Sequence, residues 1–247
     1  MLYNPETPDS VFDNEFTRRY GAAGKNLLAA SSLAGKTPMA ITSYYDFTFD
    51  LTIYTEGMMA QMGKDKTLKY ISVDEQIKRP VLDSNAHVSI ADYVKGGNFN
   101  NKITPFKLAD QLEADCNKAL DLVKNINTTK NTALMYEVAD IRTWSYLGLS
   151  LAEKIRGGVA LQTYRVKGGE ENKQRAVSHL EKALGYWNEV ATITRPIYLD
   201  MPLVHMTDQN GQHWKDNYYQ KFHWANITPQ VAADIDVAKN AKAMSIK

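Results

Sequence analysis

Carboxylates and tyrosines alternate in the stretch SYYDFTFDLTIYTEG, residues 43–57. On a helix, Asp46 and Asp50 would share one face, because residues four apart lie one turn above each other. Carboxylates accept hydrogen bonds from sugar hydroxyls, flat rings cover the C–H faces of sugars, and paired carboxylates carry out glycoside hydrolysis. The candidate ligand-binding residues here are Tyr44, Tyr45, Asp46, Asp50, Tyr54 and Glu56. The alternative is a buried aromatic helix whose acids face solvent. A catalytic dyad is not expected, because groups this close in sequence rarely flank a scissile bond without partners from elsewhere.

A second aromatic stretch is PLVHMTDQNGQHWKDNYYQKFHW, residues 202–224, which holds three of the five histidines and two of the four tryptophans. Asn210-Gly211 within it predicts a tight hairpin turn, because a type I′ turn needs positive φ at both central residues. The flanking segments would then pair as a short ribbon. This ribbon would either pack its rings over the helix ends or contact a ligand or another domain through His205, His213, Trp214, His223 and Trp224.

Motifs for metal binding and nucleophilic catalysis are missing. The histidines of residues 202–224 fall eight and ten residues apart, without the H-E-x-x-H spacing of a zinc site. Cys116 is the only cysteine, and no G-x-S-x-G is present. Arg156 precedes Gly157-Gly158 without a phosphate-loop spacing, so a close helix crossing or a turn explains the glycine pair better. We therefore expect no metal and no cofactor, and we assign no catalytic residue.

Composition excludes one class of partner. The 247 residues carry 29 Lys and Arg against 28 Asp and Glu, a formal net charge of +1. A chain with this charge balance has no excess of basic residues with which to attract nucleic acids or anionic membranes. No apolar run approaches the roughly 18 residues of a membrane span.

The elements that must position these residues are helices in the second half of the chain. Thr104-Pro105 predicts a helix start, and apolar residues three to four apart follow it at Leu108, Leu112, Cys116, Leu120 and Val123. A longer helix over 132–165 is apolar on several faces, which is typical of a central position in a bundle. The segment 171–193 places one stripe at Ala176, Leu180, Ala183, Trp187 and Val190, and a last helix is predicted to start at Thr228-Pro229.

The first hundred residues are less regular. A short helix with Phe12, Phe16 and Tyr20 on one face should stop at Gly21, and a second helix should end at Gly35. Residues 39–62 carry both strand-forming side chains and a helical face, and we predict helix because no strand partner is evident. Two further short helices are expected after the N-caps Ser72 and Ser89.

These elements predict an all-α fold: an irregular multi-helix bundle with antiparallel long helices and one polar, aromatic, hairpin-like insertion. Residues 1–103 would form an irregular helical part packing on a bundle of residues 104–247, in one continuous domain. No fixed period supports a repeat array.

Several phrases together resemble a known type of protein. YNPETPDSVFDNEFTRRYG, KITPFKLADQLEADCNKALDLV, EVADIRTWSYLGLSLAEKIRGGVAL, AVSHLEKALGYWNEV and ITPQVAADIDVAKN are similar to the helical C-terminal region of bacterial secreted glycoside-hydrolase-like proteins of α-glucuronidase or hexosaminidase type. There a (β/α)₈ barrel precedes such a region. The resemblance implies a polysaccharide-processing context, an export signal upstream and catalytic carboxylates in the barrel, so no catalytic residue carries over to this chain.

The resemblance predicts a non-catalytic helical accessory domain that contacts carbohydrate or docks on a catalytic barrel, in a secreted or periplasmic protein. A cytoplasmic protein also fits the cysteine usage. The segment IRTWSYLGLSLAEKIRGGVAL is additionally similar to helical glycan-binding proteins of polysaccharide-uptake systems. The alternative function is therefore a stand-alone helical glycan-binding or scaffolding protein. A regular stack of helix pairs would favour this alternative, and an irregular bundle would count against it.

Overall fold

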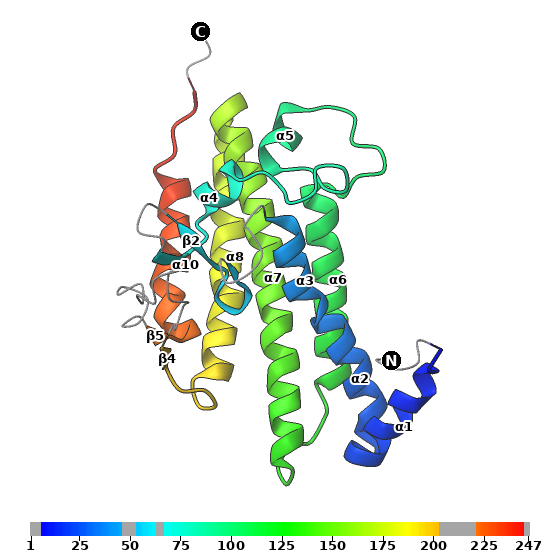
Figure 1. Cartoon of the computed structure of the whole chain (residues 1–247). Helices are drawn as coiled ribbons and strands as arrows, with labels where there is room; N and C mark the ends of the chain where they lie inside the picture. The colour runs from blue at the N-terminus through cyan, green and yellow to red at the C-terminus, as the bar shows by residue number, and fades with distance from the viewer. Residues whose placement is uncertain (1–5, 46–52, 63–66, 203–220, 245–247) are drawn as a thin grey trace, which may run out of the picture.

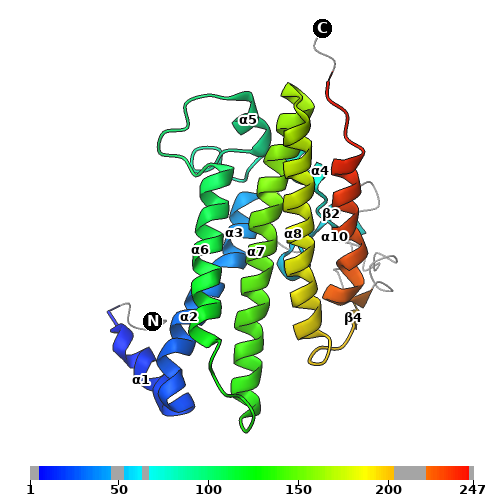
Figure 2. The same cartoon turned by 180° about the vertical axis from the view of Figure 1, so that it is seen from behind.

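The fold is built on a layer of long helices. The computed structural model describes residues 6–45, 53–62, 67–202 and 221–244. In it α6 (Pro105–Val123), α7 (Thr132–Lys167), α8 (Glu170–Thr194) and α10 (Trp224–Lys239) lie side by side, each antiparallel to the one before (Figure 2). The all-α bundle predicted from the sequence is confirmed.

The apolar stripes of these helices explain the layer. All the predicted stripe residues of α8 are buried, and Trp187, the largest of them, is fully enclosed. In α6 the stripe is buried at Leu108, Leu112, Cys116 and Val123, with Ala119 added to it. α7 has apolar residues around most of its circumference because it contacts α6 on one side, α8 on the other and the short N-terminal elements in front.

The N-terminal elements cover one face of this layer (Figure 1). Helix α1 packs on α2, α2 packs on α6 and α7, and α4 and α5 pack on α7. Ser72, Ser89 and Thr104 are N-caps whose side chains accept from backbone N–H groups, as the sequence predicted. The bounds are α1 Asp9–Tyr20, η1 Gly21–Ala23, α2 Gly24–Ala34, α3 Lys36–Tyr44, α4 Val73–Lys78 and α5 Ile90–Lys95.

The helix predicted over residues 39–62 is wrong in its second part. Helix α3 ends at Tyr44, and the chain then forms β1 (Ile53–Tyr54), η2 (Thr55–Gly57) and β2 (Met59–Met62). The missing strand partner is β3 (Thr67–Tyr70), which pairs antiparallel with β2. With this partner present, the β-branched and aromatic side chains of the segment follow their ordinary preference for strand.

The last helix also begins earlier than predicted. Helix α10 starts at Trp224, with His223 as its N-cap, and Pro229 lies inside it rather than in its first turn. The ring Nδ1 of His223 accepts from the backbone N–H of Ala225 at 3.0 Å, so a histidine caps this helix. Thr228-Pro229 is therefore not a helix start.

Glycines let α7 approach its neighbours closely. Gly157 faces Leu180 of α8, and Gly158 faces Ile90 of α5. Both lie inside an unbroken helix, which confirms the helix-crossing interpretation of the glycine pair. Of the three α7 glycines Gly148 is packed most tightly: a Cβ there would lie 2.4 Å from Cys116 Sγ and 2.5 Å from Thr37 Oγ1.

A buried ion pair joins the layer internally. Lys154 of α7 lies 2.5 Å from Asp234 of α10, and its ammonium also donates to the carbonyl of Ile71 and sits over the Tyr70 ring. The second Asp234 oxygen accepts from the backbone N–H of Val73 at 2.8 Å. Burial lowers the pKa of Lys154, against the opposing effect of the Asp234 charge. Among the helices of the described residues, none is long and apolar enough to cross a bilayer.

Candidate functional site

The two aromatic stretches singled out in the sequence meet in space. The indole Nε1–H of Trp224, at the start of α10, donates to the backbone carbonyl of Glu56 in η2 at 2.7 Å. Strand β4 (Met201–Pro202) pairs with β5 (Lys221–Phe222) at the base of the second stretch. A hydrogen bond across 168 positions of sequence thus joins segments that the sequence alone could not place together.

Four rings form a continuous cluster at this junction, and we call Tyr54, Tyr198, Phe222 and Trp224 the aromatic cluster. Phe222 lies 5.5 Å from Tyr54 and 5.1 Å from Trp224 between ring centroids, and Trp224 lies 5.6 Å from Tyr198. Phe222 is buried, whereas the other three rings are partly exposed. The cluster therefore combines a fixed apolar base with ring surface that a ligand can reach.

The cluster is anchored to the bundle beneath it. Trp187 of α8, fully buried, donates its indole N–H to the carbonyl of Trp224 at 3.0 Å. Gly57 allows the two segments to touch, since a Cβ there would lie 2.6 Å from the Phe222 ring. Buried contacts of this kind hold the partly exposed rings in a preformed geometry.

Polar groups surround the rings. Glu56 is partly exposed beside Tyr54, and burial together with the Glu56 charge raises the pKa of Tyr54. The hydroxyl of Tyr198 donates to Asp140 of α7, and burial and this hydrogen bond raise the pKa of Tyr198. The sequence reasoning missed Tyr198, Phe222 and Asp140. Tyr198 lies only four positions before the second stretch, which could have drawn attention to it.

His223 is buried beneath Trp224 as the α10 N-cap. Burial lowers its pKa, with a further contribution from the charge of Arg195. Because Nδ1 accepts a hydrogen bond, that nitrogen carries no proton, and the neutral ring fits this site. The His223 side chain therefore acts as the N-cap of the α10 backbone.

Other predicted site residues lie elsewhere. Tyr44 and Tyr45 are buried in the core, where the Tyr44 hydroxyl lies 3.5 Å from the Val88 carbonyl and the Tyr45 hydroxyl accepts from Gln76 at 2.8 Å. Burial raises the pKa of both tyrosines. Five predicted residues lie outside the described residues: Asp46, Asp50, His205, His213 and Trp214. Of the predicted set, the structure brings together Tyr54, Glu56, His223 and Trp224.

Arg156 stands at the centre of a separate ion network. Its guanidinium pairs with Asp110 at 2.7 Å, Glu113 at 2.5 Å and Glu153 at 2.8 Å, and Glu153 also contacts His179 at 2.7 Å. Burial acts to raise the pKa of Glu153, but the bonds and charges of His179 and Arg156 outweigh it and lower that pKa. The network ties α6, α7 and α8 together, which is a structural use of Arg156.

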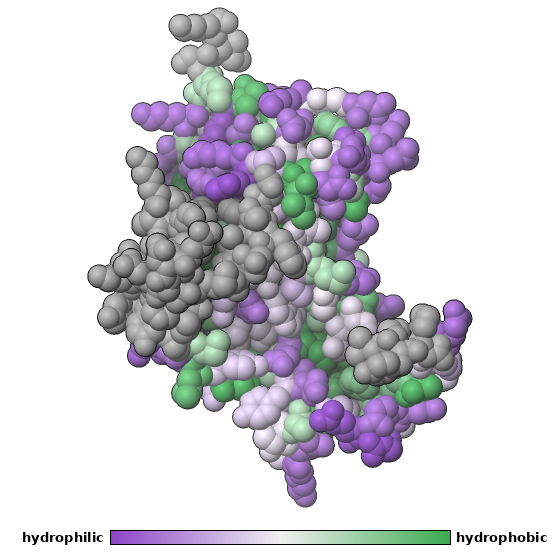
Figure 3. Space-filling model, in the orientation of Figure 1, coloured by the Kyte–Doolittle hydropathy of each residue, from purple (hydrophilic) through white to green (hydrophobic). Residues whose placement is uncertain are grey.

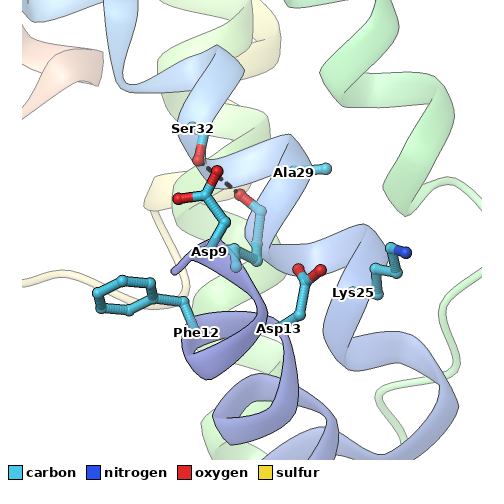
Figure 4. Close-up of a pocket in the computed structure, with 7 residues that line it drawn as sticks. Asp9, Phe12, Asp13, Lys25, Ala29 and Ser32 are labelled. Carbon is cyan, nitrogen blue, oxygen red and sulfur yellow. Dashed lines mark hydrogen bonds between the residues drawn. The ribbon is translucent and has the colours of Figure 1, made fainter. Parts of the chain in front are cut away.

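A pocket of about 480 Å³ lies between α1 and α2. Figure 4 shows Asp9 and Asp13 on α1, Lys25 and Ser32 on α2, and Phe12 pointing away from Lys25. The Ser32 hydroxyl donates to the Leu28 carbonyl within α2. This shallow, mixed-charge groove has no arrangement specific to one chemistry.

The face in Figure 3 is mostly hydrophilic with scattered apolar residues. Within the described ranges no group of three or more His, Cys, Asp or Glu residues is arranged to hold a metal ion.

Comparisons with known proteins support the fold. No family model matches the chain, and no curated protein matches it. A solved structure does match: a GH138 enzyme targeting pectin rhamnogalacturonan II, with a TM-score of 0.65 and 14% identity. The match covers 96% of this chain and 35% of that enzyme, so the chain spans about a third of the enzyme's length. At this identity the likeness concerns the fold alone, and the chain therefore has the helical fold found in part of that enzyme.

Proposed function

We propose that this chain is a non-catalytic helical accessory domain of a glycoside-hydrolase-like protein and that it contacts carbohydrate through the aromatic cluster. The observation that carries the proposal is the convergence of Tyr54 and Glu56 with Trp224 on one partly exposed surface. Exposed ring faces pack on the C–H faces of sugars, and a neighbouring carboxylate accepts from their hydroxyls. The fold shared with part of a GH138 enzyme supports this context.

Contact with a catalytic domain is the second use of the same surface. Leu199 is 86% exposed and Met201 51% exposed beside the cluster, and apolar side chains of this kind are suited to an interdomain contact. Sequencing the gene upstream of codon 1 tests the contact with a catalytic domain. A continuous frame encoding a (β/α)₈ barrel supports docking, and a stop codon directly upstream contradicts it.

Calorimetric titration with uronic-acid and hexosamine oligosaccharides tests the sugar contact. Tyr198→Leu removes one partly exposed ring from the cluster and should weaken binding at least several-fold, whereas Tyr198→Phe keeps the ring and should retain most of the binding. Phe106→Ala is the matched control, because Phe106 is an exposed aromatic residue that contacts Tyr93, away from the cluster. Absence of binding by every oligosaccharide, or equal binding by Tyr198→Leu, would contradict the sugar contact.

A regular stack of helix pairs would favour the stand-alone glycan-binding alternative, but the bundle is irregular. The helices α6, α7, α8 and α10 have 19, 36, 25 and 16 residues, and short elements of several kinds cover one face. Unequal helices without a repeated pair favour the accessory-domain proposal over the alternative.

A further inference from the structure

A second pocket, of about 320 Å³, lies at the other side of α7 from Asp140 and Tyr198. It is formed by the end of α6, the loop that follows and the first half of α7, which run together at their lower ends in Figure 2. Val123 and Val138 provide apolar walls. This volume is at the lower end of the range for small-molecule sites, which is enough for a single sugar-sized body.

The charged side chains that line this pocket are all cationic. Arg142 and Lys124 both line it, from different elements, and no carboxylate lines it. Lys124 pairs with Asp121, but both side chains are exposed, and pairs of this kind contribute little and exchange readily with solvent. For Arg142, the described part of the chain offers no ion-pair or hydrogen-bond partner.

An anion in the pocket meets two opposing charges, the solvent-exposed carboxylate of Asp121 beside Lys124 and the end of α6. The C-terminal end of α6 points its carbonyls towards this region, and a helix terminus carries roughly half a negative charge. The positive charges of Arg142 and Lys124 together exceed these two, because no described carboxylate pairs with Arg142. A guanidinium also matches a carboxylate geometrically, because two parallel N–H groups meet its two oxygens.

The pocket is also preformed. Arg142 and Tyr146 lie four apart on α7 and so share a face, and Tyr146 stacks on Tyr186 of α8 at 6.3 Å between centroids and 29° between planes. Thr128 adds a partly exposed hydroxyl from the loop. The loop itself is fixed by internal hydrogen bonds, among them the one from the Asn131 N–H to the Thr128 carbonyl at 3.1 Å.

We propose that this pocket binds a small carboxylate whose body has the size of a sugar ring: Arg142 and Lys124 bind the carboxylate, Tyr146 packs on the ring, and Thr128 hydrogen-bonds to it. A uronic acid and a non-sugar cyclic carboxylate share this chemistry. The pocket shares no residue with the aromatic cluster, so its test is independent of the test of the proposed sugar contact there.

The test is titration of the intact chain, followed by calorimetry and by backbone amide NMR, with three probes: galacturonate, neutral galactose and cyclohexanecarboxylate. We expect galacturonate to bind, to shift the amides of Thr128 and Tyr146, and to bind more weakly as salt is raised. Galactose should bind at least about tenfold more weakly, because it lacks the group that Arg142 recognises. Equal binding of cyclohexanecarboxylate would support a carboxylate site without sugar selectivity.

Charge-changing variants test which basic side chains bind the carboxylate. Arg142→Gln should reduce the affinity for galacturonate about tenfold. Arg142→Lys should keep part of the affinity, because lysine retains the positive charge but not the planar guanidinium with its two parallel N–H donors. Lys124→Gln should weaken binding several-fold, whereas Lys118→Gln, an equal charge change on an exposed α6 residue outside the pocket, should not. Unchanged melting temperatures would show that the exposed variants fold. Equal affinity for galactose and galacturonate, no binding of either carboxylate, or shifts confined to Tyr198 and Trp224 would overturn the inference.

Discussion

Lys154 and Asp234 lie 2.5 Å apart with side chains only 2% and 3% exposed, and they join α7 to α10 across 80 positions of sequence. Each also bonds to a different part of the backbone around α4, through the Ile71 carbonyl and the Val73 N–H. The pair therefore fixes α7, α10 and the start of α4 at one point.

Asp234→Asn should destabilise the fold strongly. It leaves the Lys154 ammonium buried without its counter-charge, which costs about 3–5 kcal/mol in comparable cases. Urea denaturation would measure the loss. The control is Asp115→Asn, which breaks the exposed pair with Lys36 and should change stability by no more than about 1 kcal/mol. Similar losses for the two variants would show that the buried pair contributes no more than a surface one.

Two mid-helix glycines should respond to alanine with opposite signs. Gly148→Ala forces a methyl group against Cys116 and Thr37 and should cost about 1–3 kcal/mol. Gly185→Ala on α8 meets nothing within 4 Å and should stabilise by about 1 kcal/mol, because alanine favours helix. Thermal melts of both variants check the signs. Stabilisation by Gly148→Ala would mean that α3, α6 and α7 can separate without cost.

Gly57 and Phe222 should be energetically coupled. Gly57→Ala places a Cβ 2.6 Å from the Phe222 ring and should destabilise by about 1–3 kcal/mol. Phe222→Leu removes the ring edge that the methyl group meets. The double variant should therefore lose less than the sum of the two single losses, by about 0.5 kcal/mol or more. Denaturation of the three variants completes the cycle, and strict additivity would show that the contact adapts freely.

Stability should fall below neutral pH in a way that depends on His223. Burial lowers the pKa of this ring from its ordinary 6.5, so the folded state prefers the neutral form. Its contribution is complete above the unfolded value of 6.5 and declines as the pH falls through that value towards the folded one. Protonation of Nδ1 also removes the acceptor for the Ala225 N–H, a cap worth about 1 kcal/mol.

His223→Asn supplies the control for this prediction, because asparagine caps helices without titrating. Urea denaturation at neutral pH and at about pH 5 should show a smaller loss of stability in the variant. Part of the loss should remain, since burial also lowers the pKa of His87. Identical pH profiles in the two proteins would exclude His223 as a contributor.

Local patterns predicted the helical layer well. The stripe of Ala176, Leu180 and Trp187 and the caps at Ser72 and Thr104 depend on residues within a few positions of each other, so the sequence carries them directly. The strand from Ile53 was missed because its stability depends on pairing beyond the segment, with β2 and through it with β3. A histidine cap was missed because serine, threonine, aspartate and asparagine dominate at such positions.

The candidate site shows the same limit. Sequence composition identified both aromatic stretches, and four of their predicted residues meet at the aromatic cluster or directly beneath it. The sequence did not predict where these residues lie: Tyr44 and Tyr54 belong to one stretch, yet Tyr44 is buried in the core and Tyr54 is a partly exposed member of the aromatic cluster. Burial of that kind depends on which helices pack nearby, and spacing along the chain does not contain it.

The pairing of β4 with β5 has a consequence for how this protein can diversify. It brings Met201 and Phe222 into register, so the chain leaves β4 and enters β5 at neighbouring positions. Closing a longer connection costs only about 0.6 kcal/mol for each doubling of length. Lengthening the connection between β4 and β5 should therefore cost little stability, so insertions at this junction are compatible with the same helical scaffold.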